Sequence, residues 1–471
     1  MQVVKNYLYN AFYQVFILLV PLITTPYLSR VLGPTGVGIN AYTNSVIQYF
    51  ILFGSIGVGL YGNRQVAYVR RNRQELTKTF YEIFFMRLLT ISLAMLAFFV
   101  FLSLTNHYQT YYLAQSVSLI AVIFDISWFF MGVENFAVTV LKNLVVKIAT
   151  LISIFAFVKN ESDLGLYILI LSLSLLLGNL TLFPSLKKYI GRPVLHQLNL
   201  SRHLLPSLKL FVPQIATQVY LVVNKTMLGS MTSVQAAGYF DQSDKIIKVV
   251  LAVVTATGTV MLPHVASAFA RGEHERTREY LYESFSFVSA IAFPMFFGIM
   301  AVAPKFVPLF FTGRFRAVIP LMTIEAIVIL LIAWSNAIGT QYLLPTNQTK
   351  SYTESVFLGA IVNIAINIPL ITVWGATGAA VATVLSETTV TAYQLWVVRK
   401  QVSISKLLVD TSKYFPAGLI MFAIVNLLDR KLSASWGALA LEVITGAFIY
   451  ALMLIVLRAN IVKKAIRLVR H

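Results

Sequence analysis

The sequence predicts an all-α polytopic membrane protein with about fourteen transmembrane helices, and three observations indicate this class. Hydrophobic residues make up 58% of the 471 residues and charged residues only 12%, whereas a soluble domain is about half apolar and about a quarter charged. Runs of about 20 apolar residues, the length that crosses a bilayer as a helix, recur along the whole chain. The connections between these runs reach roughly 22 residues at most, so we expect no folded extramembrane domain.

The candidate spans fall into a group of six that precedes the longest basic connection and a group of eight that follows it. They cover residues 8–28, 40–61, 80–104, 111–133, 136–157, 164–184, 207–229, 237–263, 280–303, 318–343, 354–374, 377–398, 410–429 and 436–457.

The distribution of Lys and Arg predicts how these spans are oriented. With the N-terminus inside, 26 of the 37 basic residues fall in cytoplasmic segments and only 7 in outer segments. The remaining four, Arg87, Lys225, Lys245 and Lys248, lie within spans or at their edges. Because cytoplasmic loops of membrane proteins carry the excess of basic residues, we expect both termini in the cytoplasm.

The longest basic connection divides the chain into two helical lobes. We expect an N-terminal six-helix lobe over residues 1–184, a basic cytoplasmic linker over 185–206, a C-terminal six-helix lobe over 207–400, and an additional helix pair with a basic tail over 401–471. A faint internal repeat agrees with this division. LSRVLGPTGVGINAY around Gly38 and LGSMTSVQAAGYFDQ around Gly238 both join two spans, about 200 residues apart. The pattern predicts two pseudo-symmetric bundles, as in many secondary transporters.

The composition excludes several classes of function. There is no cysteine, and the six histidines show no metal-ligand spacing, so we expect no metal and no cofactor. The net charge of +19 would suit nucleic acid, but membrane orientation explains basic residues in short loops, so we expect no nucleic-acid partner. A polymerase or glycosyltransferase would need a large loop and a catalytic acid or metal site, and the chain has no Asp-x-Asp pair, so we do not expect an enzyme.

Polar residues form stripes at helical spacing on the first, second, seventh and eighth spans, and the eleventh span carries a further pair. The stripes consist of Asn6, Asn10 and Gln14 in the first span, Asn40, Asn44 and Gln48 in the second, Gln214, Gln218 and Lys225 in the seventh, and Asn363 and Asn367 in the eleventh. For any single Asn or Gln, hydrogen bonding between packed helices is the favoured interpretation. Polar stripes at corresponding places in both halves, the eighth span included, favour a shared hydrophilic cavity.

The eighth span carries four charged residues on one helical face: Asp241, Asp244, Lys245 and Lys248, at i, i+3, i+4 and i+7. A charge in lipid is costly and usually faces a cavity or a partner, so this face is predicted to line a transport pathway. The alternative is that each acid pairs with the lysine four residues later, which is compatible with a functional role.

Four more ionisable residues lie inside spans: Arg87, Asp125, Glu325 and Glu387. Arg87 and Lys225 have no obvious partner nearby in the sequence and could instead snorkel to a lipid headgroup. A basic cavity selects anions, and phosphate or pyrophosphate is the natural candidate because Arg and Lys donate charge-assisted hydrogen bonds to it. The candidate substrate-binding residues are Arg87, Lys225, Lys245, Lys248, Asn40, Asn44, Gln48, Gln214 and Gln218, and the candidate ion-coupling residues are Asp125, Asp241 and Asp244.

Several segments resemble a known family. DISWFFMGVENF at 125–136 resembles the fourth-helix signature of the polysaccharide flippases of O-antigen and capsule type, members of the multidrug/oligosaccharidyl-lipid/polysaccharide exporter superfamily. YNAFYQVFILLVPLITTPYLSRVLGPTGVGINAY is similar to the family's first hairpin, AAGYFDQSDKI to the start of its eighth helix, and GATGAAVATVLSE to its eleventh-to-twelfth turn. The sequence departs from the family at Asn224 and Lys225, where many relatives carry an acidic residue, which weakens any cation-coupling role there.

The resemblance implies a monomeric transporter in the bacterial cytoplasmic membrane, with two lobes around a cavity that opens alternately to each side. It implies as substrate an oligosaccharide repeat unit on polyprenyl (undecaprenyl) pyrophosphate, moved to the outer leaflet, with membrane lipids and polysaccharide polymerase machinery as further partners. The motifs carry over Asp125, Trp128, Glu134, Lys225, Asp241 and Lys245 as candidates. For Trp128 and Glu134, an aromatic interface anchor and a solvated loop carboxylate are alternative interpretations. The alternative function is a multidrug or organic-cation antiporter of the same superfamily.

Overall fold

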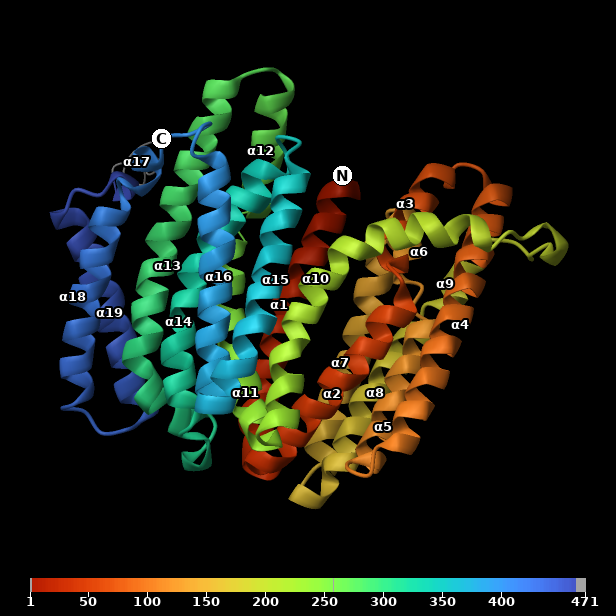
Figure 1. Cartoon of the computed structure of the whole chain (residues 1–471), viewed down its shortest axis with the longest axis horizontal. Helices are drawn as coiled ribbons and strands as arrows, with labels where there is room; N and C mark the ends of the chain where they lie inside the picture. Colours follow the sequence, from red (N-terminus) through yellow and green to blue (C-terminus); the bar gives the residue numbers. More distant parts are fainter. Residues whose placement is uncertain (1, 257, 463–471) are drawn as a thin grey trace. The chain divides into compact units, whose positions relative to one another are not determined.

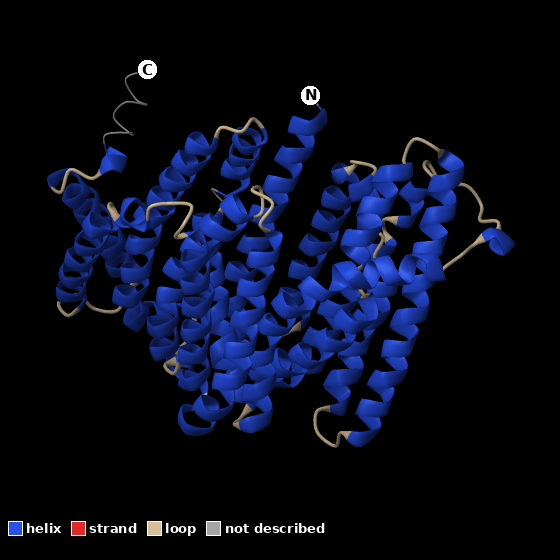
Figure 2. Ribbon diagram, turned by 45° about the horizontal axis from the view of Figure 1, so that its top comes forward, coloured by secondary structure: helices blue, strands red, loops and turns tan. Residues whose placement is uncertain are grey.

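The computed structural model consists of helices joined by short loops and divides into two compact units, Met1–Gly229 and Ser230–His471 (Figures 1 and 2). It describes residues 2–256 and 258–462, with the side chains of all of these except residues 2–15, 18, 212–213, 216–217, 220–221 and 259–260. The polar stripe Asn6, Asn10 and Gln14 of the first span therefore lies outside the described side chains. The four-part division at residues 184, 206 and 400 stays a prediction.

The first unit contains the helices of the first six predicted spans and nearly all of the helix of the seventh. They are α1 (Gln2–Val31), α2 (Gly33–Ser55), α3 (Val58–Val69), α4 (Arg73–Leu104), α5 (Gln109–Ile123), α6 (Ser127–Gly132), α7 (Phe136–Phe157), η1 (Glu161–Asp163), α8 (Leu164–Leu180), α9 (Phe183–Leu186), η2 (Leu195–Gln197) and α10 (Ser201–Met231).

The second unit begins in the last turn of α10 and contains the remaining helices. They are α11 (Val234–Thr255), α12 (Gly258–Ala270), α13 (His274–Phe310), η3 (Gly313–Phe315), α14 (Val318–Ser335), the π-helical segment η4 (Asn336–Leu343), α15 (Thr349–Trp374), α16 (Ala376–Val398), α17 (Ile404–Leu408), α18 (Thr411–Asp429) and α19 (Trp436–Val456).

Ten helical stretches of the described residues are long and apolar enough to cross a bilayer. They coincide with the second to sixth, ninth to eleventh, thirteenth and fourteenth predicted spans. The other four predicted spans correspond to α1, α10, α11 with α12, and α16. Charge explains the low apolarity of α11, which has four charged residues among 22. The chain is a multi-pass membrane protein, and the full number of fourteen spans stays a prediction.

Large apolar side chains are exposed along the outer helices of both units. Leu93 on α4 and Val145 on α7 are examples in the first unit, and Ile444 and Phe448 on α19 are examples in the second. A soluble protein rarely exposes such continuous apolar surface, and a bilayer covers it without cost because lipid tails are equally apolar.

The second predicted span is broken into α2 and α3 by a short left-handed turn. Ile56 and Gly57 have φ values of 38° and 74°, and a β-branched residue rarely adopts a positive φ. The turn is held by α10, because the Ser207 hydroxyl donates a 2.6 Å hydrogen bond to the Ile56 carbonyl. A Cβ on Gly57 would lie 3.1 Å from the Ser207 carbonyl oxygen, so the close approach of α10 also favours glycine here.

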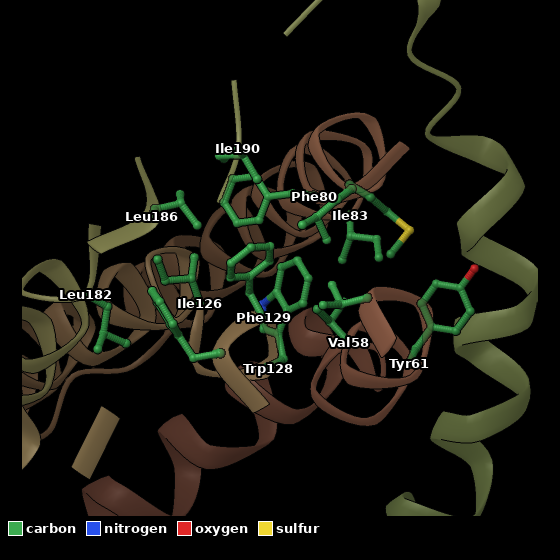
Figure 3. Packing of buried hydrophobic residues seen from close by; sticks show 14 of the residues in the cluster. Val58, Tyr61, Phe80, Ile83, Ile126, Trp128, Phe129, Leu182, Leu186 and Ile190 are labelled. Carbon is green, nitrogen blue, oxygen red and sulfur yellow. The ribbon is translucent and has the colours of Figure 1, made fainter. Parts of the chain in front are cut away.

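An aromatic core joins α3, α4 and α6 in the first unit (Figure 3). The Trp128 ring is buried and stacks on Phe80 at a centroid distance of 5.6 Å. Gly62 on α3 gives the indole its space, because a Cβ there would lie 2.5 Å from Trp128 Cε3. The short helix α6 is therefore fixed against α3 and α4 by shape as well as by apolar burial.

In the second unit, the last two helices, α18 and α19, run beside α13 (Figure 1). A buried ion pair joins them to it. The Lys305 ammonium on α13 contacts the Glu442 carboxylate on α19 and lies 3.1 Å from the Asp429 carboxylate at the end of α18. It also donates a 2.8 Å hydrogen bond to the Asp429 carbonyl. Separating the members of such a pair leaves a buried charge without its partner, which is strongly destabilising. The contact therefore holds α18 and α19 in one position on α13.

We expect Gly62→Ala to destabilise the first unit, because the added methyl group overpacks the Trp128 ring. The free energy of unfolding should fall by about 1–3 kcal/mol. The matched control is Gly59→Ala on the same helix, where an added Cβ meets no atom within 4 Å and helix propensity favours alanine. Thermal unfolding of the purified protein in detergent measures both variants, and an equal effect of the two would contradict the assigned packing.

Candidate functional site

The charged face of α11 consists of two ion pairs. Lys245 Nζ lies 2.6 Å from Asp241 Oδ2, and Lys248 Nζ lies 2.6 Å from Asp244 Oδ2. The predicted pairing at i, i+4 is thus confirmed, and the two pairs are electrically neutral when both partners are ionised. The lysine side chains are 40% and 43% exposed, whereas Asp241 is buried. The face therefore presents its ammonium groups and keeps its carboxylates behind them.

A third carboxylate lies behind this face. Glu325 on α14 is buried and accepts a short hydrogen bond from the Ser243 hydroxyl of α11. Glu325 therefore adds a third acidic side chain beside two neutral pairs. The sequence showed Glu325 within a span, but the contact with α11 joins residues 82 apart and could not be read from local spacing.

The polar stripe of α2 is held by hydrogen bonds. Gln48 donates a 3.1 Å hydrogen bond to Asn44 within the helix, and Gln115 of α5 donates a 3.3 Å hydrogen bond to Asn40. Asn44 is exposed, while Asn40 and Gln48 are half-buried. Asn40 thus has the interhelical bond that was the favoured interpretation of a single Asn, and Asn44 with Gln48 faces outward from the helix packing.

The structure brings α10 beside the stripe of α2. The Thr226 hydroxyl donates a 2.8 Å hydrogen bond to Ser45 of α2, so the neighbouring Lys225 lies close to the helix that carries Asn44. Lys225 and Gln214 are half-buried and Gln218 is exposed. Of the seventh-span candidates, Lys225 lies nearest to the stripe of α2, because Gln218 and Gln214 come about two and three turns earlier on α10.

Arg87 and Asp125 form a partly buried ion pair. Arg87 Nη2 lies 3.2 Å from Asp125 Oδ2, and Nη1 donates a 2.7 Å hydrogen bond to the Asp125 carbonyl. The Arg87 side chain is only 5% exposed, so the alternative interpretation, that it snorkels to a headgroup, is wrong. Its partner was missed because Asp125 lies on another helix, 38 residues away.

Asp125 also shapes the break between α5 and α6. Its Oδ1 accepts a 3.0 Å hydrogen bond from the Ser127 amide, and its carbonyl accepts one of 3.0 Å from the Trp128 indole.

The interpretation of Trp128 as an interface anchor is wrong, because its ring lies in the core (Figure 3). Glu134 is 63% exposed and pairs with Arg70 at 2.6 Å, in agreement with a solvated carboxylate.

A buried acid–histidine cluster was missed by sequence reasoning. Glu82 of α4 is fully buried and lies 2.5 Å from Arg202 and 2.9 Å from His203 at the start of α10. His203 Nδ1 lies 2.7 Å from the Tyr61 hydroxyl, and Nε2 lies within hydrogen-bond distance of both Glu82 and Arg202 Nε. Burial lowers the pKa of His203, and the Glu82 hydrogen bond opposes that shift. A glutamate on an apolar helix was the signal, but its partners lie more than 100 residues away.

A polar cluster surrounds the π-helical segment of the second unit and was also missed. Gln341 donates a 3.0 Å hydrogen bond to Asn336 and accepts one from Ser284 of α13. π-helical turns are rare in proteins, but those that occur often lie at functional sites. No local sequence pattern distinguishes this turn from the α-helix that precedes it.

Comparison with known proteins identifies the class first. The helical units define a polytopic membrane protein, and structure comparison shows that its fold resembles that of lipid and multidrug transporters. The structure matches one titled "Lipid II flippase MurJ, inward closed conformation" with a TM-score of 0.81 and 16% identity. The match covers 97% of this chain and 100% of that one. It also matches a multidrug resistance MATE family transporter of the MOP superfamily, with a TM-score of 0.65, 12% identity, and coverage of 81% of this chain and 94% of that one.

The sequence then identifies the family. The profile of the family described as "Polysaccharide biosynthesis protein" matches residues 3–269, and the chain belongs to this family. A curated relative from Escherichia coli (strain K12), named "Putative O-antigen transporter", is 24% identical over 401 residues, covering 84% of this chain and 96% of the relative. A relative of the same name from Shigella dysenteriae is 20% identical over 393 residues, covering 81% and 96%. The family resemblance drawn from the motifs is thereby confirmed.

We expect Asp125→Asn to destabilise the first unit, because it keeps an oxygen for the Ser127 amide but leaves the Arg87 guanidinium buried without its counter-charge. The free energy of unfolding should fall by about 3 kcal/mol, and the amount of protein in the membrane should fall with it. Glu134→Gln is the control, since an exposed pair such as Glu134 with Arg70 contributes about 0–1 kcal/mol to the free energy of unfolding. Thermal unfolding compares the two variants, and equal losses would show that the Arg87 pair contributes no more than a surface contact.

Proposed function

We propose that this protein is a flippase that moves polyprenyl (undecaprenyl) pyrophosphate-linked oligosaccharide repeat units from the cytoplasmic to the outer leaflet by alternating access, for cell-surface polysaccharide synthesis. The observation that carries the proposal is the α11 face, where Lys245 and Lys248 are half-exposed. The chain belongs to a family described as a polysaccharide biosynthesis protein, which agrees with an anionic, sugar-bearing substrate. The names of the curated relatives support an O-antigen type of substrate, and the fold match to a lipid II flippase supports transport of a lipid-linked saccharide.

The lysines of α11 are proposed to bind the pyrophosphate by exchanging partners. Lys245 and Lys248 each hold one carboxylate, and a pyrophosphate offers several charged acceptor oxygens for the same donors. Their partial exposure allows this exchange without opening a packed core. Arg87, in contrast, is enclosed with Asp125, so we assign it to the framework of the first unit.

Partner exchange also suggests how transport is coupled to an ion gradient. When a lysine turns to the substrate, its aspartate loses the cation that stabilised its charge, and it becomes a better acceptor for a proton or another cation. Asp244 is in this position, whereas Asp125 keeps Arg87 and the Ser127 amide. We therefore prefer Asp244 as the coupling residue.

The polar residues near α2 are proposed to contact the sugars. Asn44 and Gln48 carry amides that pair with hydroxyl groups, and Lys225 lies close to this helix. Gln218 presents a further exposed amide on α10. The charge distribution of the loops supports a location in the bacterial cytoplasmic membrane with both termini in the cytoplasm.

The second candidate function is export of organic cations. The α11 face and Glu325 together contain three acidic side chains against two lysines, so a cationic ligand would find acceptor oxygens there. The match to a multidrug transporter fold agrees with this function as well. Variants of the α11 lysines distinguish the two functions. Removing their charge should weaken binding of an anionic substrate and strengthen binding of a cationic one.

We expect Lys245→Gln and Lys248→Gln each to lower the translocation rate about tenfold, because each removes a charge-assisted hydrogen bond to pyrophosphate. Membrane levels should stay normal, since both side chains are partly exposed. The measurement is the appearance of lipid-linked repeat units in the outer leaflet of proteoliposomes.

Lys350→Gln is the matched control, because Lys350 also faces a carboxylate four residues away, Glu354, but is 90% exposed. It should leave translocation unchanged. Wild-type rates in both α11 variants would refute the lysine assignment, and increased efflux of an organic-cation dye by them would favour the antiporter.

A further inference from the structure

A cavity of about 390 Å³ lies within the first unit, between the first turns of α4 and the linker that follows α9. Its walls include Arg73, Thr77 and Lys78 of α4, and Arg192 and Gln197 of the linker. Both segments belong to the side that the basic residues predict to be cytoplasmic. The volume is in the range of small-molecule sites.

The cavity has a strongly positive lining. Arg73, Lys78 and Arg192 face a single carboxylate, Glu75, and within the described part of the chain none of these three cations is in an ion pair. The first amides of α4 are already used, because the Asn72 side chain accepts from the Gln74 and Glu75 amides. The available donors are therefore the guanidinium and ammonium groups, which suit phosphate.

The linker wall of the cavity is fixed at both ends. At one end, the Gly191 amide donates a 3.0 Å hydrogen bond to the Thr77 hydroxyl, which itself donates to the Arg73 carbonyl. At the other end, the Asn199 amide donates a 2.7 Å hydrogen bond to the buried Glu82. A loop tied down on both sides holds its cations in place before a ligand binds, which lowers the entropic cost of binding.

A related cavity occupies the corresponding place in the second unit. It has a volume of about 290 Å³ and lies between the start of α13 and the residues that follow α16. Thr277 and Arg278 line it, 200 residues after Thr77 and Lys78. Arg278 lies 3.3 Å from Glu275, so one of the cations that line this second cavity is already neutralised. The repeat has kept the position of the cavity, and the free positive charge is greater in the first unit.

We propose that the first-unit cavity binds a phosphate-bearing anion, with Arg73, Lys78 and Arg192 as its donors. Val194 and Leu195, next to Arg192, expose their apolar side chains. Such a combination of exposed apolar residues and cations is typical of an element lying in the membrane interface. The anion is therefore the phosphate of an acidic phospholipid headgroup in the adjacent leaflet, which would tie the linker to the membrane.

The test compares two sources of phosphate on the full-length protein in neutral detergent. Native mass spectrometry measures binding of phosphatidylglycerol against phosphatidylcholine with the same acyl chains, and calorimetry measures binding of inorganic pyrophosphate. We expect preferential binding of phosphatidylglycerol, and the triple variant Arg73→Gln, Lys78→Gln, Arg192→Gln should weaken it roughly tenfold or more.

The matched control is Arg71→Gln, Lys187→Gln, Lys188→Gln, which removes three exposed cations from the same two segments outside the cavity lining. It should keep the preference, and thermal unfolding verifies that both variants are folded. Tight pyrophosphate binding lost only in the cavity variant, without lipid preference, would support the site and assign a soluble phosphate compound to it. Equal binding by wild type and both variants would overturn the proposal.

Discussion

The cost of placing charge in a membrane protein is the constraint on which the rest of this structure depends. An ionised side chain away from water is tolerated only beside a partner. Arg87 with Asp125 joins α4 to the break between α5 and α6, and Lys305 joins α13 to α18 and α19. These pairs do more than neutralise charge, because each one ties together helices whose lipid-facing surfaces have no hydrophobic reason to associate.

Exposure separates the pairs that maintain the fold from those that are free to act. The Arg87 side chain is enclosed, and its guanidinium also bonds the backbone of the segment that it positions. Lys245 and Lys248 are bound to carboxylates of their own helix, so releasing them disturbs no other element. A substrate can bind such an ammonium group only where breaking the existing ion pair costs little free energy. This argument assigns the α11 pairs to function and the Arg87 pair to architecture.

Local periodicity predicted the helices and the short-range pairs well. The fifth span coincides with α7 at both ends, because uninterrupted apolar sequence leaves no other choice in lipid. The pairing of Asp241 with Lys245 followed from helical spacing alone. Contacts between distant segments could not be derived in this way. Arg87 and Asp125 are 38 residues apart, and Glu82 and His203 are 121 apart, so only the tertiary fold brings them together.

The internal repeat carries more information than symmetry of shape. Thr77 and Thr277 each donate a hydrogen bond to the carbonyl four residues earlier, at the start of α4 and of α13. A basic residue follows each threonine, and a cavity lies beside each pair. An acid lies three residues before each basic residue, Glu75 in the first unit and Glu275 in the second, and its pairing is what differs. Arg278 lies 3.3 Å from Glu275, whereas Lys78 forms no ion pair with Glu75 in the described part of the chain. The repeat therefore keeps the cavity and its residue types, and the pairing of one carboxylate leaves more free positive charge in the first unit.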